Sequence, residues 1–178
     1  MSSVRLAVAV ALSLLTSSAG AEGLSVLGFQ LGKTSPDEVT AALSPKGKVS
    51  SGSMNYYSRG PMLKVEGRAL PVEGLKEAIF IFDAGQHLEA VDMKLDKTRF
   101  DTFLKRLKAK YEVVLGAVPP VGDKLVRFHD GTTTIVLTAL QMSSDMRVCY
   151  IDDDLFARFE ADNKKGAIEK EQREAAQF

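Results

Sequence analysis

Side chains that could carry out catalysis or bind a metal ion are few and widely spaced in this sequence. His87 and His129 are its two histidines, and Cys149 is its single cysteine. A zinc site would need both histidines to converge with a third ligand, and a cysteine nucleophile needs an activating base. The spacing indicates neither, and the HExxH, CxxC and GxSxG patterns are absent. We therefore expect no catalytic residue, no metal and no cofactor, and predict that the protein is not an enzyme.

Cys149 is open to two interpretations besides that of a nucleophile. It lies in an alternating apolar segment between Arg147 and Ile151, which favours a buried, small hydrophobic side chain. A lone cysteine cannot form an intramolecular disulfide, so an intermolecular disulfide is the alternative. We expect the buried form.

Three consecutive acidic residues, 152–154, stand directly before the apolar residues Leu155 and Phe156. Acidic side chains cap and stabilise the first turn of a helix. A calcium loop of the EF-hand type needs oxygen ligands spread over about twelve residues, with a glycine at the bend. This segment does not follow that pattern, so we expect it to begin a last helix.

Two Lys-Thr pairs lie at equivalent places in the similar segments 31–43 and 95–107. A Lys-Thr pair beside a glycine, as in residues 32–34, can suggest phosphate binding. The upstream glycine loop of such sites is missing here, and Asp96 replaces the glycine in the second segment. We interpret both segments as strand-to-helix junctions of a duplicated unit.

The first junction has strong signals for the start of a helix. Ser35 can cap the helix, Glu38 follows it at capping-box spacing, and Pro36 suits the first helical position. Thr34 with Asp37 offers the same capping spacing one residue earlier, and the two alternatives stay open.

The second junction leads into a helix predicted over residues 98–111, with Thr98 as the expected cap and Asp96 as the alternative. Apolar residues recur at helical spacing and predict a core-facing side. These residues are Phe100, Phe103, Leu104, Leu107 and Tyr111.

Strands are predicted over residues 24–31, 76–83, 87–95, 124–129, 132–140 and 147–151, with two further short strands around residues 59–61. The segment 78–82 is apolar at every position, which is typical of a central strand covered on both faces. The hairpin 128–131 resembles the hairpin 82–85, and residues 116–122 are interpreted as a linker loop. The second unit is therefore predicted to be a shorter copy that lacks one hairpin.

Residues 1–21 have the pattern of a cleaved signal peptide. Arg5 precedes the apolar run 6–15, and residues 19–21 have the small-x-small form of a signal peptidase site. The run is shorter than the roughly 20 apolar residues of a membrane span. We predict cleavage near Ala21 and a periplasmic or secreted protein without a transmembrane anchor. A single domain is expected at 22–161, followed by a charged helical or frayed tail at 162–178.

The charge balance argues against nucleic acid as a partner. The chain has 23 basic and 23 acidic residues, so it has no basic excess to neutralise phosphates. Tyr56, Tyr57 and Arg59 are instead the candidate binding residues. Consecutive tyrosines in a strand would place one ring outward, and exposed aromatic side chains favour protein interfaces. The alternative is one packed tyrosine with its neighbour at a rim.

Residues 28–43, GFQLGKTSPDEVTAAL, resemble the opening of small envelope proteins of the BamE/SmpA type and the related duplicated fold of β-lactamase inhibitor protein. In that group an apolar-Gly-x-Thr/Ser entry leads into a short amphipathic helix, followed by antiparallel strands. This chain lacks the lipid-anchoring cysteine, and residues 45–47 stand where a Gly-x-Pro turn is expected. The resemblance implies a protein-binding role without catalysis.

We therefore predict an α+β fold with an internal duplication. It should have an antiparallel sheet of about six to seven strands, with two to three helices mainly on one face. The predicted function is that of an exported, non-enzymatic protein-binding module, such as an envelope assembly factor, an inhibitor or an immunity-type protein. Its partner would be another protein of the cell envelope. The first alternative is a small-ligand or lipid carrier with a cavity between sheet and helices, and the second is a hydrolase.

Overall fold

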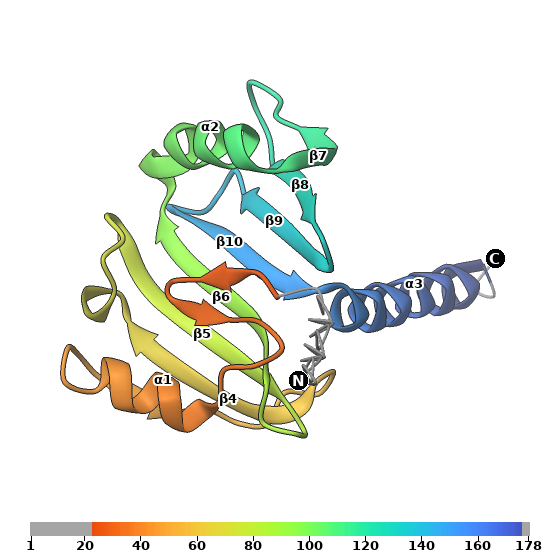
Figure 1. Ribbon diagram of the computed structural model, residues 1–178. Helices are drawn as coiled ribbons and strands as arrows, with labels where there is room; N and C mark the ends of the chain where they lie inside the picture. Colours follow the sequence, from red (N-terminus) through yellow and green to blue (C-terminus); the bar gives the residue numbers. More distant parts are fainter. Residues whose placement is uncertain (1–22, 176–178) are drawn as a thin grey trace, which may run out of the picture.

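The computed structural model describes residues 23–175, which form an α+β fold (Figure 1). The signal peptide expected at residues 1–21 and residues 176–178 of the expected tail lie outside the described residues. Within residues 23–175, no helix combines the length and apolar character needed to cross a membrane.

An eight-stranded antiparallel sheet forms the centre of the molecule, in the order β3-β4-β5-β6-β10-β9-β8-β7, beside a separate hairpin of β1 and β2. The strands are β1 (Ser25–Val26), β2 (Phe29–Gln30), β3 (Val49–Ser51), β4 (Arg59–Glu66), β5 (Leu75–Asp83), β6 (Leu88–Asp96), β7 (Glu112–Ala117), β8 (Lys124–Asp130), β9 (Thr133–Ala139) and β10 (Asp145–Asp152). The helices are α1 (Pro36–Leu43), α2 (Phe100–Lys110) and α3 (Asp153–Ala175), and short 3-10 turns span Gly67–Ala69 and Lys97–Arg99.

The strand order divides the sheet into two units of the same construction. Helix α1 precedes β3 to β6, and helix α2 precedes β7 to β10. Within each unit the four strands are neighbours in chain order, and the last strands, β6 and β10, pair with each other. The element order is therefore that of a duplicated helix-plus-four-strands unit.

Two sequence-based predictions about the second unit are wrong. The second unit contains the hairpin that was expected to be missing. The sheet has eight strands, where about six to seven were expected. Both errors come from β7, whose last residues were assigned to a linker loop. By strand order, the turn 128–131 corresponds to the turn between β4 and β5, and not to the turn 82–85.

Strand β7 is an exposed sheet edge. All six of its residues are exposed, and it pairs with β8 on one side only. A bulge between Val113 and Leu115 interrupts the pairing register with β8, as is common at sheet edges. An edge strand without alternating burial gives no period-2 pattern, so the sequence did not reveal it.

The segment expected to be a single strand at residues 24–31 is a hairpin. Leu27 and Gly28 both have positive φ, at 57° and 88°, which suits the two central residues of a tight hairpin turn. Val26 consequently pairs with Phe29, and Ser25 with Gln30.

The two helix starts use different caps. Ser35 forms the full capping box of α1: its Oγ accepts the Glu38 amide at 3.3 Å, and its own amide donates to Glu38 Oε2 at 2.7 Å. Thr34 instead accepts a bond from the Gln30 amide. At the second junction Asp96 accepts the Thr98 amide at 2.9 Å, so Thr98 is not the cap. A 3-10 turn follows, and α2 begins at residue 100, two residues later than predicted.

One face of the sheet carries the main core. Val39 of α1, Leu107 of α2 and Phe29 of the β1–β2 hairpin pack there with Phe80 and Val148 of the central strands. The two helices and the hairpin therefore share this face.

Helix α3 lies on the opposite face, where Leu155 packs against Ala90 and Ile151. It covers only part of this face and then extends away from the sheet (Figure 1). In segment 78–82, Ala78, Phe80 and Phe82 are fully buried, but Ile79 and Ile81 are half-buried. The expectation of a strand covered on both faces is therefore wrong.

Candidate binding surface between the aromatic loop and helix α3

The three predicted binding residues lie on one surface at the loop between β3 and β4, residues 52–58, here named the aromatic loop. Tyr56 is 79% exposed. Tyr57 is half-buried and packs edge-to-face with Tyr56 and with Phe159 of α3, at ring-centroid distances of 5.1 and 5.5 Å. Arg59 begins β4 and is exposed. The tyrosines therefore lie in a turn and not in a strand, which corrects the sequence-based interpretation.

Asn55 fixes the shape of the aromatic loop from within. Its Oδ1 accepts hydrogen bonds from the amides of Tyr57 and Ser58, at 2.9 and 3.0 Å, as in an Asx turn. The backbone amide of Asn55 donates to the Gly60 carbonyl, and its backbone carbonyl accepts the Arg59 amide, both at 2.9 Å. The loop is thus closed at both ends, which restricts both tyrosines.

Close approach to β5 requires a glycine where the loop enters β4. A Cβ at Gly60 would lie 2.1 Å from the Phe82 carbonyl oxygen and 2.2 Å from that of Asp83. The preceding residue, Arg59, has a φ of 58°, a conformation that is uncommon outside glycine. The point at which the Arg59 side chain leaves the backbone is therefore set by a specific backbone geometry.

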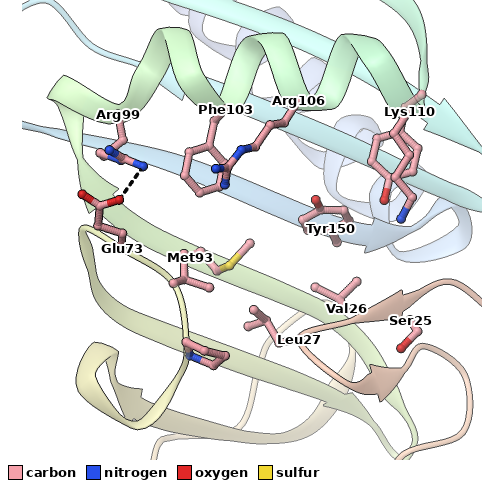
Figure 2. A pocket seen from close by; sticks show the side chains of 13 residues that line it. Ser25, Val26, Leu27, Glu73, Met93, Arg99, Phe103, Arg106, Lys110 and Tyr150 are labelled. Atoms are coloured by element: carbon pink, nitrogen blue, oxygen red, sulfur yellow. Dashed lines mark ion pairs between the residues drawn. The ribbon is translucent and has the colours of Figure 1, made fainter.

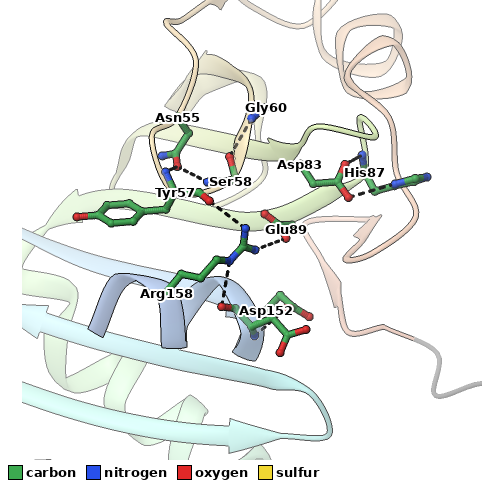
Figure 3. A network of polar contacts seen from close by, with 10 residues as sticks. Asn55, Tyr57, Ser58, Gly60, Asp83, His87, Glu89, Asp152 and Arg158 are labelled. Carbon is green, nitrogen blue, oxygen red and sulfur yellow. Dashed lines mark hydrogen bonds and ion pairs between the residues drawn. The ribbon is translucent and has the colours of Figure 1, made fainter. Parts of the chain in front are cut away.

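Arg158 joins the aromatic loop to the sheet and to α3 (Figure 3). Its Nη1 donates to the Tyr57 carbonyl at 2.9 Å, and its Nη2 to Glu89 Oε1 at 2.7 Å. Its Nε donates to the Asp154 carbonyl one turn earlier. Burial raises the pKa of Glu89, and the Arg158 guanidinium partly opposes that rise. Within residues 23–175, Glu89 Oε2 is buried without a hydrogen-bond partner.

Tyr57 is also tied to α3 through its hydroxyl. The hydroxyl donates to Asp162 Oδ2 at 3.0 Å, across 105 positions of sequence. This hydrogen bond to a carboxylate raises the pKa of Tyr57, so the phenol remains a donor at neutral pH. The first three turns of α3 thus hold the aromatic loop at both the backbone and the ring.

An apolar groove of about 450 Å³ continues from the loop along the face that α3 partly covers. Strands β5, β10 and β9 contribute Ile81, Cys149 and Val136, and α3 contributes Phe156 and Phe159. At one side of the groove Arg147 donates two hydrogen bonds to Asp92, at 3.2 and 2.5 Å. The groove is therefore apolar along its length and charged at this side.

Cys149 lies in this groove and is half-buried. Burial is the main cause that raises the pKa of its thiol, and the nearby Asp92 carboxylate adds to the rise. Because the thiolate is the reactive form, this environment disfavours a nucleophilic role.

The two histidines pair with different aspartates. His87 Nδ1 lies 3.3 Å from Asp83 Oδ2 at the β5–β6 turn, and His129 Nε2 lies 2.9 Å from Asp153 Oδ2. Asp153 is the first residue of α3, so the acidic triplet begins a helix as predicted. In the described part of the chain, no three His, Cys, Asp or Glu side chains are placed to hold a metal ion.

Apolar and cationic groups remain exposed around the aromatic loop. Met54, Tyr56 and Phe159 are all exposed. Within residues 23–175, the Arg59 guanidinium makes no hydrogen bond or ion pair, and it lines a hollow of about 580 Å³ together with Glu89. The surface combines apolar side chains with one free cation.

Sequence reasoning missed the α3 residues that complete this surface. No local pattern in the sequence links Phe159 to Tyr57. Arg158 and Asp162 are charged residues of an amphipathic helix, which usually face solvent. The consecutive tyrosines 56 and 57 were the sequence signal closest to the site.

Comparisons of the chain with models of known families, with curated proteins and with solved structures found no match.

Proposed function

We propose that the chain is an exported, non-enzymatic protein-binding module that docks a protein of the cell envelope on the aromatic loop and the first turns of α3. The observation that carries this proposal is Tyr56, which is 79% exposed although its loop is fixed by Asn55 and Arg158. The export part of the proposal rests on the signal-peptide pattern of residues 1–21.

A fixed, exposed tyrosine is well suited to recognition. Tyrosine and arginine are enriched among the residues that dominate binding energy at protein interfaces. Binding costs less conformational entropy when these side chains are already ordered. Tyr57 holds the Tyr56 ring edge-to-face, and the positive φ of Arg59 sets the direction of its Cα–Cβ bond.

The chemistry of the surface indicates what a partner must present. Met54, Tyr56 and Phe159 offer apolar contact area, and Arg59 offers a guanidinium without an intramolecular partner among the described residues. The complementary surface is an apolar depression beside a carboxylate, because guanidinium and carboxylate pair through two hydrogen bonds. An assembly factor, an inhibitor and an immunity-type protein would all use such a contact.

The element order adds support. Each unit has a helix followed by antiparallel strands, which is the order implied by the resemblance to BamE/SmpA-type proteins and β-lactamase inhibitor protein. That resemblance implies protein binding as the role of the fold.

The proposal can be tested by affinity capture from periplasmic extract, with the mature chain as bait. A protein retained by the wild-type chain should be lost with Tyr56→Ala, by about tenfold or more, since hot-spot truncations exceed about 1.4 kcal/mol. Lys108→Ala is the matched control, because Lys108 is exposed on α2, on the opposite face of the sheet. It should retain the partner fully.

Charge reversal provides a second, independent variant. Arg59→Glu should also release the partner, while circular dichroism and thermal melting should show an intact fold. The proposal would be wrong if the wild-type chain retained no protein, or if Tyr56→Ala and Arg59→Glu retained it as well as the control.

A further inference from the structure

A second cavity lies on the other face of the sheet, between α2 and the β1–β2 hairpin (Figure 2). Its volume is about 420 Å³, within the range of roughly 300–1,000 Å³ typical of small-molecule sites. Its lining residues come from β1 and the following turn, the loop 71–73, β6, the end of the 3-10 turn Lys97–Arg99, α2 with residue 111, and β10. It is therefore separate from the aromatic loop and from α3.

One side of helix α2 faces this cavity. Arg99 is the N-cap residue of α2, and Phe103, Arg106 and Lys110 follow it at intervals of four, three and four residues, which places them on one helix face. Figure 2 shows all four on the side of α2 that is directed toward Met93 and the hairpin. The helix thus brings three cations and one aromatic ring to the same opening. We name this site the basic cavity.

The cations of the basic cavity are only partly neutralised. Glu73 is the acidic residue among its lining residues, and it pairs with Arg99 at 2.9 Å from a side chain that is 79% exposed. Arg99 Nε is buried without a hydrogen-bond partner among the described residues. Within residues 23–175, the Arg106 guanidinium makes no hydrogen bond or ion pair. Lys110 contacts the ring of Tyr111, with Nζ 4.9 Å from its centroid.

This excess of positive charge is local. The whole chain has equal numbers of basic and acidic residues, but the basic cavity has three cations against one carboxylate. Guanidinium groups bind carboxylates and phosphates through parallel hydrogen bonds. The head of a bound ligand would therefore be an anion.

The floor of the basic cavity is apolar. Val26 and Leu27 of the hairpin, Met93 of β6 and Phe103 of α2 line it. Tyr150 of β10 lies beside them, and burial raises the pKa of its phenol, so its hydroxyl is uncharged. A floor of this kind would accept hydrocarbon, with a hydroxyl at one side.

We infer that the basic cavity binds a small amphipathic organic anion. Its carboxylate or phosphate head contacts Arg99 and Arg106, and its short apolar body lies against the hairpin and Met93. The limited volume fits a free small acid, whereas a lipid would have to leave most of its chains outside. This inference does not depend on the proposed docking of a protein, because the two sites lie on opposite faces of the sheet.

Calorimetric titration of the full mature chain tests the inference. Octanoate and octyl phosphate are the anionic probes, and octan-1-ol is the uncharged probe of the same chain length. Inorganic phosphate is the anionic group without an alkyl chain. Either anionic probe should bind saturably and at least about tenfold more tightly than octan-1-ol, because a hydrogen bond to a charged group exceeds that factor. Inorganic phosphate should bind more weakly than octyl phosphate.

Variants locate the binding. Arg106→Gln should lower the affinity for the anionic probe at least about tenfold. The fold should not change, because Arg106 has no partner within the described chain to lose. Lys105→Gln is the matched control: it removes one charge from the neighbouring position of α2, outside the cavity lining. It should leave the affinity unchanged.

Three results would overturn the inference. Octanoate and octyl phosphate could both fail to bind, octan-1-ol could bind as tightly as they do, or Arg106→Gln could behave like Lys105→Gln. Sedimentation with phosphatidylglycerol vesicles distinguishes the source of the anion. Association with vesicles in the absence of binding to either soluble probe would indicate a membrane surface and would exclude the cavity.

Discussion

Replacing Arg158 with alanine should loosen the aromatic loop without unfolding the sheet. The change removes the donor of the 2.9 Å bond to the Tyr57 carbonyl and the cation of the 2.7 Å pair with Glu89. Glu89 would then be a half-buried carboxylate without its cation. The side chains of Arg158 and Glu89 are 44% and 15% exposed, so the loss lies between those of a surface pair and a buried pair.

The magnitude follows from these contacts. An exposed ion pair contributes about 0–1 kcal/mol, and a hydrogen bond to a charged group about 1.5–3 kcal/mol. Because Arg158 is 44% exposed, we expect a loss of about 2 kcal/mol in the free energy of unfolding, near the low end of that range. The melting temperature should then fall by about 4–8 °C. Arg158→Lys keeps the charge but not the two-pronged geometry, and should lose about half as much.

The loss should depend on pH. Burial raises the pKa of Glu89 above its ordinary value, and Arg158 opposes that rise, so the variant has the higher folded-state pKa. A raised folded-state pKa adds stability below the unfolded pKa, and this stability is lost as the pH rises through the folded pKa. Protonation of Glu89 at low pH therefore adds more to the free energy of unfolding of the variant than to that of the wild type. The difference between them should therefore be largest at neutral pH and should shrink as Glu89 becomes protonated.

Amide hydrogen exchange shows whether the loss is located in the loop. Exchange at Tyr57, Ser58 and Arg59 should become faster in Arg158→Ala, while amides of β6 and β10 should remain protected. In a double-mutant cycle with Glu89→Gln, the double variant should lose less stability than the sum of the two single losses. Unchanged exchange in the loop together with an unchanged melting temperature would refute the idea that α3 holds the aromatic loop.

Two further predictions concern the second junction and the cysteine. Asp96→Ala should lower the melting temperature more than Thr98→Ala, because the Asp96 carboxylate accepts both the amide and the hydroxyl of Thr98; equal effects would contradict this cap. The same bonds lower the pKa of Asp96, so the cost of Asp96→Ala should be present at neutral pH and be lost in acid. Cys149 should react slowly with a thiol reagent in the native protein and fast in denaturant, because burial raises the pKa of its thiol; equal rates would show an accessible thiolate.

Strands with one buried face could be predicted from the sequence. The predicted ranges 76–83, 87–95 and 132–140 differ by at most one residue at either end from β5, β6 and β9. In β6, Met93 and Leu95 alternate with the less buried Asp92 and Lys94, which is the pattern that alternating burial produces. Strand β7 lacks a buried face, so no such pattern existed to be found.

The candidate surface was predictable only in part. Tyr56, Tyr57 and Arg59 were identified because exposed aromatic residues favour interfaces. Their fixed arrangement depends on Arg158 and Asp162, which are about 100 positions later in the chain and which reach the loop only after the sheet has formed. Contacts of such long sequence separation leave no local pattern. The basic cavity likewise leaves no local pattern in the sequence, because Arg106 and the β1–β2 hairpin meet only in the folded protein.

The pairing of β6 with β10 also bears on how such a chain could arise. These strands are the last of their respective units, and they pair in an antiparallel direction. Two identical separate units related by a two-fold axis would join through the same pair of equivalent edges. The central seam therefore has the geometry of an isologous interface, which is the arrangement that joining the two subunits of a homodimer into one polypeptide would produce. The two units nevertheless differ in what they carry: the aromatic loop belongs to the first unit alone, whereas both units contribute lining residues to the basic cavity.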